Sequence, residues 1–266
     1  MKHLIFIGIT LLFFQGFLLQ GQSSDTLWNQ TDARGWKQGY WRAYYDNGKL
    51  RYRGYFKDNQ PLGEFRRYYE SGGIMAVQNF TGQGTSYVTL YYENGGLAAQ
   101  GKYVGQKRDS LWRYYSYYDK TLRMEENYRD GKLSGPSIKY YPNHRPAEII
   151  NWVDDKREGE WKQFFENGSI KLEAIYVNDK RNGYFRLYRP NGMPEVFGQF
   201  QDNLMEGEWV YFDEKGQGKI QIRYKKGEAL NPALVDSLQQ ELIKAMDANQ
   251  GKFAEPTEED FFPGRR

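Results

Sequence analysis

The chain has 266 residues, with 37 basic and 34 acidic side chains, a formal net charge of +3 and no cysteine. This balance of charge argues against a dedicated nucleic-acid binder, and a chain without cysteine has no disulfide framework, lipid-modified cysteine or thiol chemistry. Aromatic side chains make up 17% of the residues, so rings are the main apolar material available for a core.

The first 21 residues have the pattern of a secretory signal peptide. Lys2 precedes an apolar run from Leu4 to Leu19, and polar residues follow from Gln22. The run is shorter than the roughly twenty residues of a membrane-spanning helix. We expect residues 1–21 to be removed on export, so that the mature chain has no transmembrane span and works in the periplasm, at the outer surface or as a secreted protein. An uncleaved membrane anchor is the alternative.

Residues 22–38 are predicted to form a half-repeat that caps the array behind it. The stretch from Leu27 to Trp36 resembles part of the unit that recurs later, with a turn at Thr31-Asp32. An uncovered sheet edge favours aggregation, so terminal caps are expected in stacked arrays.

Residues 39–228 contain eight copies of a unit of about 24 residues, a period typical of repeat architectures. The units begin at Gly39, Gly63, Ser86, Ser110, Gly135, Gly159, Gly183 and Gly207. Five places after each start, every unit has a ring: Tyr44, Tyr68, Tyr91, Tyr115, Tyr140, Phe164, Tyr188 and Phe212. Two places after each start the residue is mostly large: Trp41, Phe65, Val88, Trp112, Ser137, Trp161, Phe185 and Trp209. A further aromatic column, seventeen places in, comprises Phe56, Phe80, Tyr103, Trp152, Tyr176, Phe200 and Tyr224, with Tyr128 one place late.

Most units contain two turn signals. The first is a dipeptide such as Asn47-Gly48 or Asn167-Gly168, and the second is a polar pair such as Asp58-Asn59 or Asp202-Asn203. These residues accept the positive φ angles of hairpin turns. We therefore predict sixteen short strands in a mainly β fold, an elongated array of about eight stacked β-hairpins forming an open single-layer sheet.

The spacing of the aromatic columns leaves one question open. The columns at places two and five are an odd number of residues apart, so a regular strand puts them on opposite faces. Either a bulge brings them to one face, or both faces of the sheet carry rings.

Residues 229–266 are predicted to form a helix and a mobile tail. Asn231 and Pro232 are a start signal, and apolar residues follow at helical spacing as far as Met246. We expect one capping α-helix from Pro232 to about Ala248, packed on the last hairpin, with a partner-binding or membrane-surface role as the alternative. The tail after Asn249 has no periodicity.

Few residues offer catalytic or metal-binding chemistry. The two histidines are His3, in the expected signal peptide, and His144, in a turn. With no cysteine and one mature histidine, the usual zinc ligand sets cannot be assembled, and no nucleophile elbow of the form Gly-x-Ser-x-Gly occurs. We expect no enzyme, no cofactor and no metal site.

Two recurring features are candidates for contact with a ligand or partner. Basic pairs follow the second turn of several units, and large rings recur in the column at place two. The candidate contact residues are Lys107, Arg108, Lys156, Arg157, Lys180, Arg181, Trp112 and Trp161. The basic pairs are either solvated turn residues or a strip that binds anionic groups. The rings are either core or a surface that stacks on sugars.

The repeat resembles the MORN-repeat variant, in which Gly-x-Trp/Phe-x-x-Tyr-Tyr-x-x-Gly-x-Leu is followed by an aromatic residue and Asp-Gly-Lys. Gly159 to Ile170 and Gly39 to Leu50 follow this pattern, whereas Val88 and Ser137 lack the early ring. Proteins of this kind are described as YwqK-type antitoxin repeat proteins, and this chain is similar to their secreted bacterial multi-repeat forms. The resemblance implies an open hairpin array of the MORN type, used as a protein-binding scaffold or lipid-headgroup binder. Choline-binding repeats have a similar period but place their Trp-Tyr-Tyr later.

These observations lead to one expected function and its alternatives. We expect a non-catalytic exported repeat scaffold that mediates protein–protein interaction in the bacterial cell envelope or at the surface, with an envelope or surface protein as partner and no nucleic acid. The alternatives are a binding module for cell-envelope glycan or anionic lipid headgroups, and an immunity or antitoxin-like protein.

Overall fold

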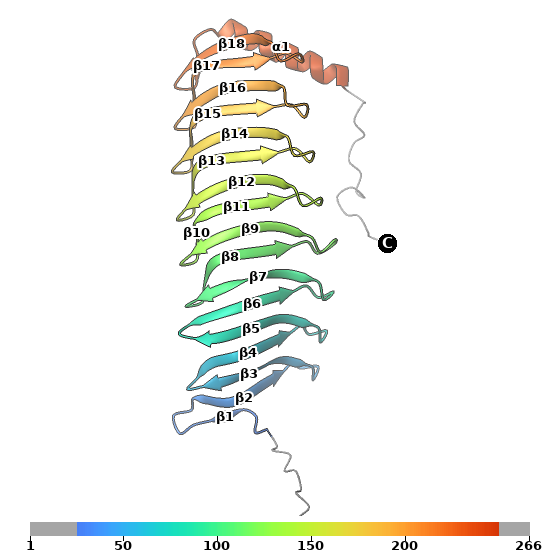
Figure 1. The fold of residues 1–266 in the computed structure, drawn as a ribbon, viewed down its shortest axis with the longest axis vertical. Helices are drawn as coiled ribbons and strands as arrows, with labels where there is room; N and C mark the ends of the chain where they lie inside the picture. Colours follow the sequence, from blue (N-terminus) through green and yellow to red (C-terminus); the bar gives the residue numbers. More distant parts are fainter. Residues whose placement is uncertain (1–25, 250–266) are drawn as a thin grey trace, which may run out of the picture.

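The computed structural model describes residues 26–249, which form a sheet of hairpins stacked along one axis and a single helix at its C-terminal end (Figure 1). The strands are β1 Gln30–Thr31, β2 Lys37–Tyr44, β3 Leu50–Lys57, β4 Gln60–Tyr68, β5 Ile74–Gly82, β6 Thr85–Tyr91, β7 Leu97–Val104, β8 Lys107–Tyr115, β9 Leu122–Arg129, β10 Lys132–Leu133, β11 Gly135–Tyr140, β12 Pro146–Val153, β13 Lys156–Phe164, β14 Ile170–Val177, β15 Lys180–Tyr188, β16 Pro194–Gln201, β17 Leu204–Phe212, β18 Gly218–Lys225 and β19 Glu228–Ala229, and the helix is α1 Pro232–Asn249. The expected signal peptide and the tail lie outside the described residues.

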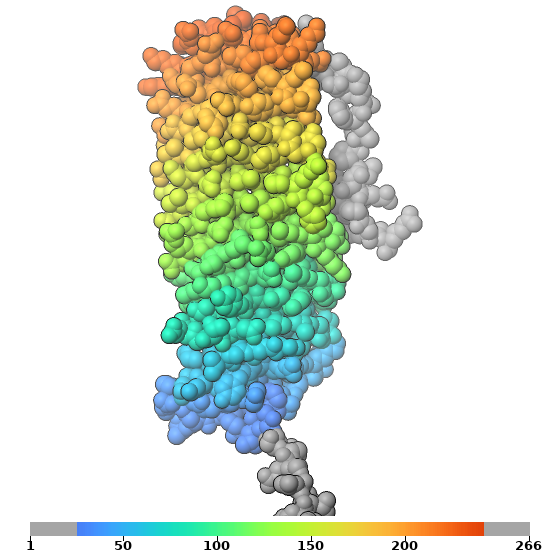
Figure 2. Space-filling view, viewed as in Figure 1, coloured from blue at the N-terminus to red at the C-terminus, as the bar shows by residue number. Residues whose placement is uncertain are grey.

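The predicted fold class is confirmed. Sixteen of the strands are long and form the eight predicted hairpins, and β1, β10 and β19 have two residues each. Every pairing between named strands is antiparallel, and each long strand lies beside the long strands that precede and follow it in the chain. The molecule is therefore a long column in which sequence position changes steadily from one end to the other (Figure 2).

The two turns of each unit form for different reasons. Second turns are two-residue hairpins in which both residues have positive φ, as at Asn178 (49°) and Asp179 (67°), and Asn and Asp tolerate this conformation well. First turns are longer and are closed by two backbone hydrogen bonds. In the first unit the amide of Gly48 donates to the carbonyl of Tyr45, and the amide of Tyr45 donates to the carbonyl of Lys49. Gly48 ends this turn at φ 79°, a conformation that favours glycine.

Both faces of the sheet carry rings. A Cβ built on Gly101 would lie 2.2 Å from the indole of Trp112, so this glycine and the indole face the same side. The neighbouring Gln100 faces the other side, and its Nε2 donates to the hydroxyl of Tyr115 at 3.0 Å. We call the side with the columns at places two and seventeen the tryptophan face, and the side with the column at place five the tyrosine face.

Each hairpin also contains a bulge, but it does not reunite the two columns. Ala43 pairs with Tyr52 and Tyr44 with Leu50, which leaves Arg51 as the extra residue in the second strand. Between the two columns the first strand alternates without interruption; its own irregularity, against the preceding unit, lies towards its start, as between Leu62 and Arg66. The question left open by the spacing is thus resolved in favour of two aromatic faces.

The core lies on the tryptophan face, where rings of successive units interlock. The rings of Trp112 and Tyr103 meet edge to face at 5.0 Å, and Trp209 meets Phe200 in the same way at 5.0 Å. Edge-to-face contacts of this kind add to the stabilisation from burial. Trp112 is 0% exposed, so adjacent units can exclude water completely although the sheet has a single layer.

A second set of contacts joins the units at the edge formed by the first turns. A tyrosine six places after the unit start donates from its hydroxyl to a backbone carbonyl of the next unit. These bonds are Tyr45 to Tyr68 (2.6 Å), Tyr69 to Tyr91 (2.6 Å), Tyr92 to Tyr115 (2.7 Å) and Tyr141 to Phe164 (2.7 Å). Arg189 takes this place in the seventh unit and donates to the carbonyl of Phe212 at 2.9 Å.

Asparagine side chains cover both open edges of the sheet. At the N-terminal end the Oδ1 atom of Asn29 accepts from the amide of Arg42 on β2. At the C-terminal end Asn231 accepts from the amide of Arg223 and donates to the carbonyl of Gln221, both on β18. Edge groups that could otherwise pair with another strand are thereby satisfied.

The helix α1 begins at Pro232 and ends at Asn249, as the sequence predicts to within one residue. The side chain of Asn231 bonds to β18 and not to the first turn of the helix, so it anchors the helix to the sheet. No helix within the described 224 residues, 26 to 249, is long and apolar enough to span a bilayer.

Candidate binding surfaces

The candidate basic pairs lie at one edge of the array, because each follows a second turn. Lys107 and Arg108 begin β8, and the other two pairs begin β13 and β15. The predicted alignment along one edge is therefore present. The two members of each pair, however, have different surroundings.

The arginine of each pair packs on rings of the tryptophan face. The guanidinium carbon of Arg157 lies 4.3 Å from the ring centre of Tyr176, that of Arg181 lies 3.9 Å from Phe200, and that of Arg108 lies 5.1 Å from Trp112. Arg157 also bonds to Asp179 at 2.9 Å, and this side-chain hydrogen bond is the main cause that lowers the pKa of Asp179. These arginines therefore contribute to the contact between units, and an anion-binding role for them stays a prediction.

The lysines of the pairs are exposed but lie among acidic groups. Lys180 is 3.3 Å from a carboxylate oxygen of Asp202. Lys156 shares a shallow hollow of about 410 Å³ with Asp154 and Glu158. The mixture of charge at this edge favours solvated turns.

The candidate tryptophans belong to the core. Trp112 is fully buried, and its Nε1 donates to the carbonyl of Lys102 at 3.1 Å. Trp161 is half-buried, and its Nε1 is buried without a partner among the described residues. Both indole nitrogens are buried, and Trp112 packs between units.

A hollow lies on the tryptophan face beside Val88, which stands where most other units have an aromatic ring. Its volume is about 490 Å³, and its walls include Phe65, Phe80, Leu90 and Tyr103. Where other units place an indole, Val88 leaves unfilled space between two layers of rings. The missing ring was visible in the sequence, but the hollow was not predicted. Ser137 is the other residue that replaces a ring in this column. Its hydroxyl is buried and has no hydrogen-bond partner among the described residues.

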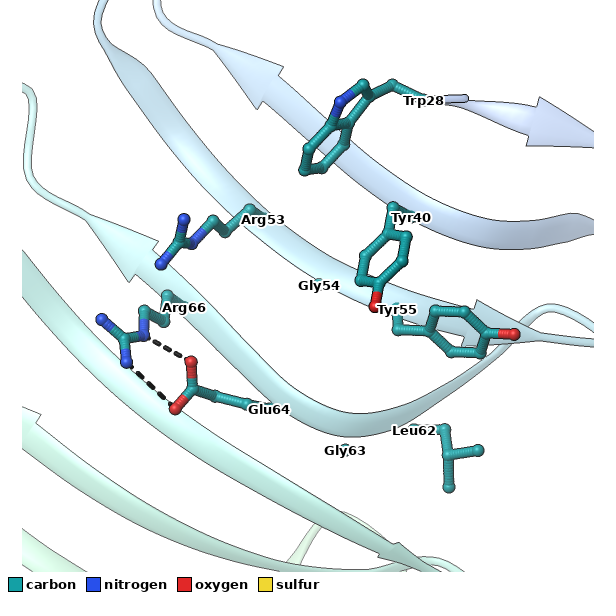
Figure 3. Close-up of a pocket in the computed structure, with 9 residues that line it drawn as sticks. All are labelled: Trp28, Tyr40, Arg53, Gly54, Tyr55, Leu62, Gly63, Glu64 and Arg66. Atoms are coloured by element: carbon teal, nitrogen blue, oxygen red, sulfur yellow. Dashed lines mark hydrogen bonds and ion pairs between the residues drawn. The ribbon is translucent and has the colours of Figure 1, made fainter. Parts of the chain in front are cut away.

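A second hollow lies on the tyrosine face of the first two units (Figure 3). It has a volume of about 460 Å³ and is lined by Trp28, Tyr40, Arg53, Gly54, Tyr55, Leu62, Gly63, Glu64 and Arg66. Tyr40 is 51% exposed and Tyr55 is 37% exposed, and their rings meet at 5.2 Å. Trp28 reaches this hollow from the N-terminal cap, so the cap forms part of the surface.

Arg53 and Arg66, which line this hollow, form a row across neighbouring strands with Arg42 on the next strand. Arg42 pairs directly with Arg53, and Arg53 pairs directly with Arg66. Directly opposite residues in an antiparallel pair are about 5 Å apart, and like charges in such positions destabilise the sheet. We call Arg42, Arg53 and Arg66 the arginine row.

The charge of the row is only partly neutralised. Arg66 makes two bonds to Glu64, at 2.6 and 3.1 Å, and this hydrogen bonding is the main cause that lowers the pKa of Glu64. The guanidinium of Arg42 lies 4.6 Å from the ring centre of Trp28. Arg53 makes no ion pair with any residue from 26 to 249.

Other units place carboxylates at the same position in the pattern. Arg113 lies opposite Glu125 and bonds to it at 2.9 Å. Glu173 lies opposite both Lys162 and Arg186, with nitrogen–oxygen distances of 3.8 Å to each. The array can therefore neutralise this column from the opposite strand, whereas in the first two units only Arg66 is paired, with Glu64 of its own strand. The arginine row is a surface that sequence reasoning missed, and the alternation of basic and acidic residues in this column was the signal.

The arrangement supports binding better than catalysis. Planar guanidinium groups bind carboxylate or phosphate oxygens in pairs, and the exposed rings of the hollow supply apolar contact. Within the part of the chain that the structure describes, no group of three or more histidine, cysteine, aspartate or glutamate side chains is placed to hold a metal.

Comparison with protein families finds the MORN repeat variant at residues 37–58, 157–178 and 205–226. These segments lie in the first, sixth and eighth units. The chain thus carries MORN-variant repeats at three places, and its architecture is that of a repeat scaffold. No curated protein matches the chain.

Three solved structures show low similarity. TarM is 14% identical with a TM-score of 0.19, over 47% of this chain and 20% of its own. TcdB2-TccC3-TEV is 11% identical with a TM-score of 0.17, over 75% of this chain and 13% of its own. A protein with unknown function from Bacteroides fragilis NCTC 9343 is 10% identical with a TM-score of 0.12, over 72% and 96% of the two chains. The chain spans a fifth or less of the length of the first two.

Proposed function

We propose that this chain is a non-catalytic repeat scaffold, exported through its N-terminal signal sequence, that binds other proteins in the bacterial cell envelope or at the cell surface. The observation that carries the proposal is the arginine row beside the exposed rings of Tyr40 and Tyr55. A row of like charges that the fold neutralises only in part, through Glu64, has a cost in stability, which is offset when an acidic partner covers it.

The sheet suits a protein partner because its surface is long and continuous. Each unit is held by neighbours on both sides, so side chains on the tyrosine face can vary without loss of the fold. Aromatic residues and arginine are the residues that most often dominate protein–protein contacts. The hollow on the first two units combines both.

Site-directed photo-crosslinking tests this proposal. A photo-reactive residue at Tyr55, inside the hollow, is compared with one at Tyr118, which is exposed at the opposite edge of the array. We expect a crosslinked envelope protein at Tyr55 that excess unmodified chain displaces and that Arg53→Gln weakens. Equal crosslinking at Tyr118, or none at either position, contradicts the proposal.

Fractionation with N-terminal sequencing tests the export part of the proposal separately. We expect the mature chain to begin near Gln22 and to be found outside the cytoplasm. A cytoplasmic chain that retains residues 1–21 refutes export but leaves the binding surface intact.

A second candidate function is binding of cell-envelope glycan or anionic lipid headgroups. The exposed rings of Tyr40 and Tyr55 favour it, because they can stack on a sugar while Arg53 binds an acidic group. Glycan arrays and sedimentation with anionic vesicles at low salt measure it. Tight binding to either, without any protein partner at the hollow, replaces the leading proposal.

The resemblance to YwqK-type antitoxin repeat proteins adds an immunity role as a third possibility. An exported chain fits protection against a secreted toxin. Survival of cells that lack the chain, when challenged with toxins of neighbouring strains, measures it.

A further inference from the structure

The arginine row requires an anionic occupant of a particular shape. The guanidinium groups of Arg53 and Arg66 line the hollow together with the rings of Trp28, Tyr40 and Tyr55 (Figure 3). Arg42 lies opposite Arg53 on the adjacent strand, so the row spans three strands, about 10 Å. A single small anion satisfies one guanidinium. An acidic peptide with aromatic side chains satisfies both the charge and the rings.

The chain itself contains such a peptide. Residues 253–262 include the acidic residues Glu255, Glu258, Glu259 and Asp260 and the aromatic residues Phe253, Phe261 and Phe262. This segment lies outside the described residues, after the end of α1 at Asn249. Its composition is the complement of the hollow, since its carboxylates match the arginines and its rings match the aromatic wall.

The segment cannot reach the row of its own chain. The β3 strand of Arg53 lies fourteen strand spacings from β18 along the array, or about 65 Å at roughly 4.8 Å each. The eleven residues from Asn249 to Asp260 span at most about 40 Å when fully extended. The helix runs across the end of the array and not back along it (Figure 1), so it does not supply the difference.

We propose that the arginine row binds residues 253–262 of a second copy of this chain. The acidic residues of the second copy bond to Arg42, Arg53 and Arg66, and its phenylalanines pack against Tyr40 and Tyr55. The N-terminal end of one array is thereby joined to the C-terminal end of another. This inference concerns the same surface as the proposed function, so a second copy and an envelope protein are competing occupants of the arginine row.

Peptide binding to the full-length chain tests the contact directly. A fluorescent peptide of residues 250–266 is titrated with the chain, and its anisotropy is measured at 50 and 300 mM salt. We expect saturable binding that weakens with salt and is at least about tenfold weaker for Arg53→Glu, since loss of one charged bond costs about one decade. Arg113→Gln, which changes a paired arginine of the same column, is the matched control and should bind as the unmodified chain does.

Charge exchange between two copies tests the assembly. Sedimentation velocity should show association of the full-length chain that rises with concentration and is lost in the triple variant E258K, E259K, D260K. Mixing this variant with Arg53→Glu should restore association in pairs, because the lysine variant keeps an intact arginine row and Arg53→Glu keeps an intact acidic segment. Thermal unfolding of each variant separates loss of contact from loss of fold.

Three results overturn the proposal. One is a chain that stays monomeric and does not bind the peptide. Another is equal peptide binding by Arg53→Glu and Arg113→Gln, which places the contact elsewhere. The third is Arg53-dependent binding to vesicles of anionic lipid that the peptide does not compete with, which makes a membrane surface the occupant. Failure of this contact leaves the crosslinking test of an envelope partner unaffected.

Discussion

The indole of Trp112 lies directly against Gly101 of the preceding strand, where any side chain would collide with the ring. Trp209 lies on Gly198 in the same way, and the Nε1 atoms of the two indoles donate to the carbonyls that follow these glycines, at 3.1 and 3.2 Å. Trp161 instead faces Ile150, and its Nε1 has no partner among the described residues. The missing side chain therefore decides both how the indole packs and whether its nitrogen is satisfied.

Gly101→Ala should destabilise the fold by about 2 kcal/mol, because the new methyl group forces the indole out of its position. Gly73→Ala is the control, since the nearest atom to a Cβ there is 3.7 Å away. Urea unfolding of both variants measures the difference. Equal urea midpoints for the two variants contradict the close packing of the Trp112 indole on Gly101.

Phe165→Tyr should stabilise the chain by up to about 1 kcal/mol, the typical net value of one hydrogen bond. Phe165 stands in the sixth unit where four other units have a tyrosine that bonds to the next unit. The new hydroxyl should donate to the carbonyl of Tyr188. Thermal unfolding measures the gain, and Tyr87→Phe, at an exposed ring, should change nothing. A variant no more stable than the parent shows that the hydroxyl fails to reach its acceptor.

Arg53→Glu should make the chain more stable by about 0.5 kcal/mol, because it places a carboxylate between Arg42 and Arg66. The gain should shrink in 1 M salt, which screens exposed charges. Arg113→Glu is the opposite control, since it faces Glu125 and should destabilise. A destabilised Arg53→Glu variant would falsify the view that the row is uncompensated.

Acid should weaken the first turn of the fourth unit over a defined pH range. A backbone hydrogen bond from Thr121 is the main cause that lowers the pKa of Asp119 to about 2, and the hydroxyl of Thr121 and Arg123 add to it. A carboxylate with a lowered pKa stabilises the fold above its unfolded pKa, and this contribution is lost as the pH falls from about 4 to 2. Asp119→Asn lacks the titrating group. The difference in melting temperature between the parent and this variant should therefore shrink as the pH falls from about 4 and be smallest below pH 2, and a constant difference contradicts the assignment.

Filling the hollow at Val88 should depend on the residue opposite. Gln78 pairs directly with Val88, at the place where Trp112 and Trp209 have glycine partners. Val88→Trp should therefore be more favourable in a Gln78→Gly background than alone, with an interaction energy of about 1 kcal/mol in a double-mutant cycle. Additive effects would show that glycine is not needed beneath the indole.

The hairpin array could be predicted because its signals are local. Turn residues such as Asn178 and Asp179 specify positive φ from their own chemistry, and the period repeats this signal eight times. The choice between one and two aromatic faces could not be predicted, because it depends on which strand holds the bulge. Arg51 is the extra residue only when Ala43 pairs with Tyr52, and that pairing is a property of two strands together.

The binding surface was largely hidden from sequence reasoning. The basic pairs are recognisable in the sequence because their members are adjacent in the chain. The packing of Arg157 on Tyr176, by contrast, depends on the next strand. The arginine row has the opposite character, since Arg42 and Arg53 are eleven residues apart and meet only through strand register. The incomplete neutralisation of its charge is recognised by comparison with Arg113, which is paired with Glu125 of the opposite strand.

The asparagine bonds at the two ends have a consequence for how such a chain can change in length. The side chain of Asn29 bonds to β2 and that of Asn231 bonds to β18, so neither set of bonds depends on how many hairpins lie between them. Duplication or deletion of a whole hairpin in the interior leaves the asparagine hydrogen bonds at both ends of the sheet unchanged. The gene can thus lengthen or shorten its product in steps of one unit, moving the two ends apart or together without rebuilding either.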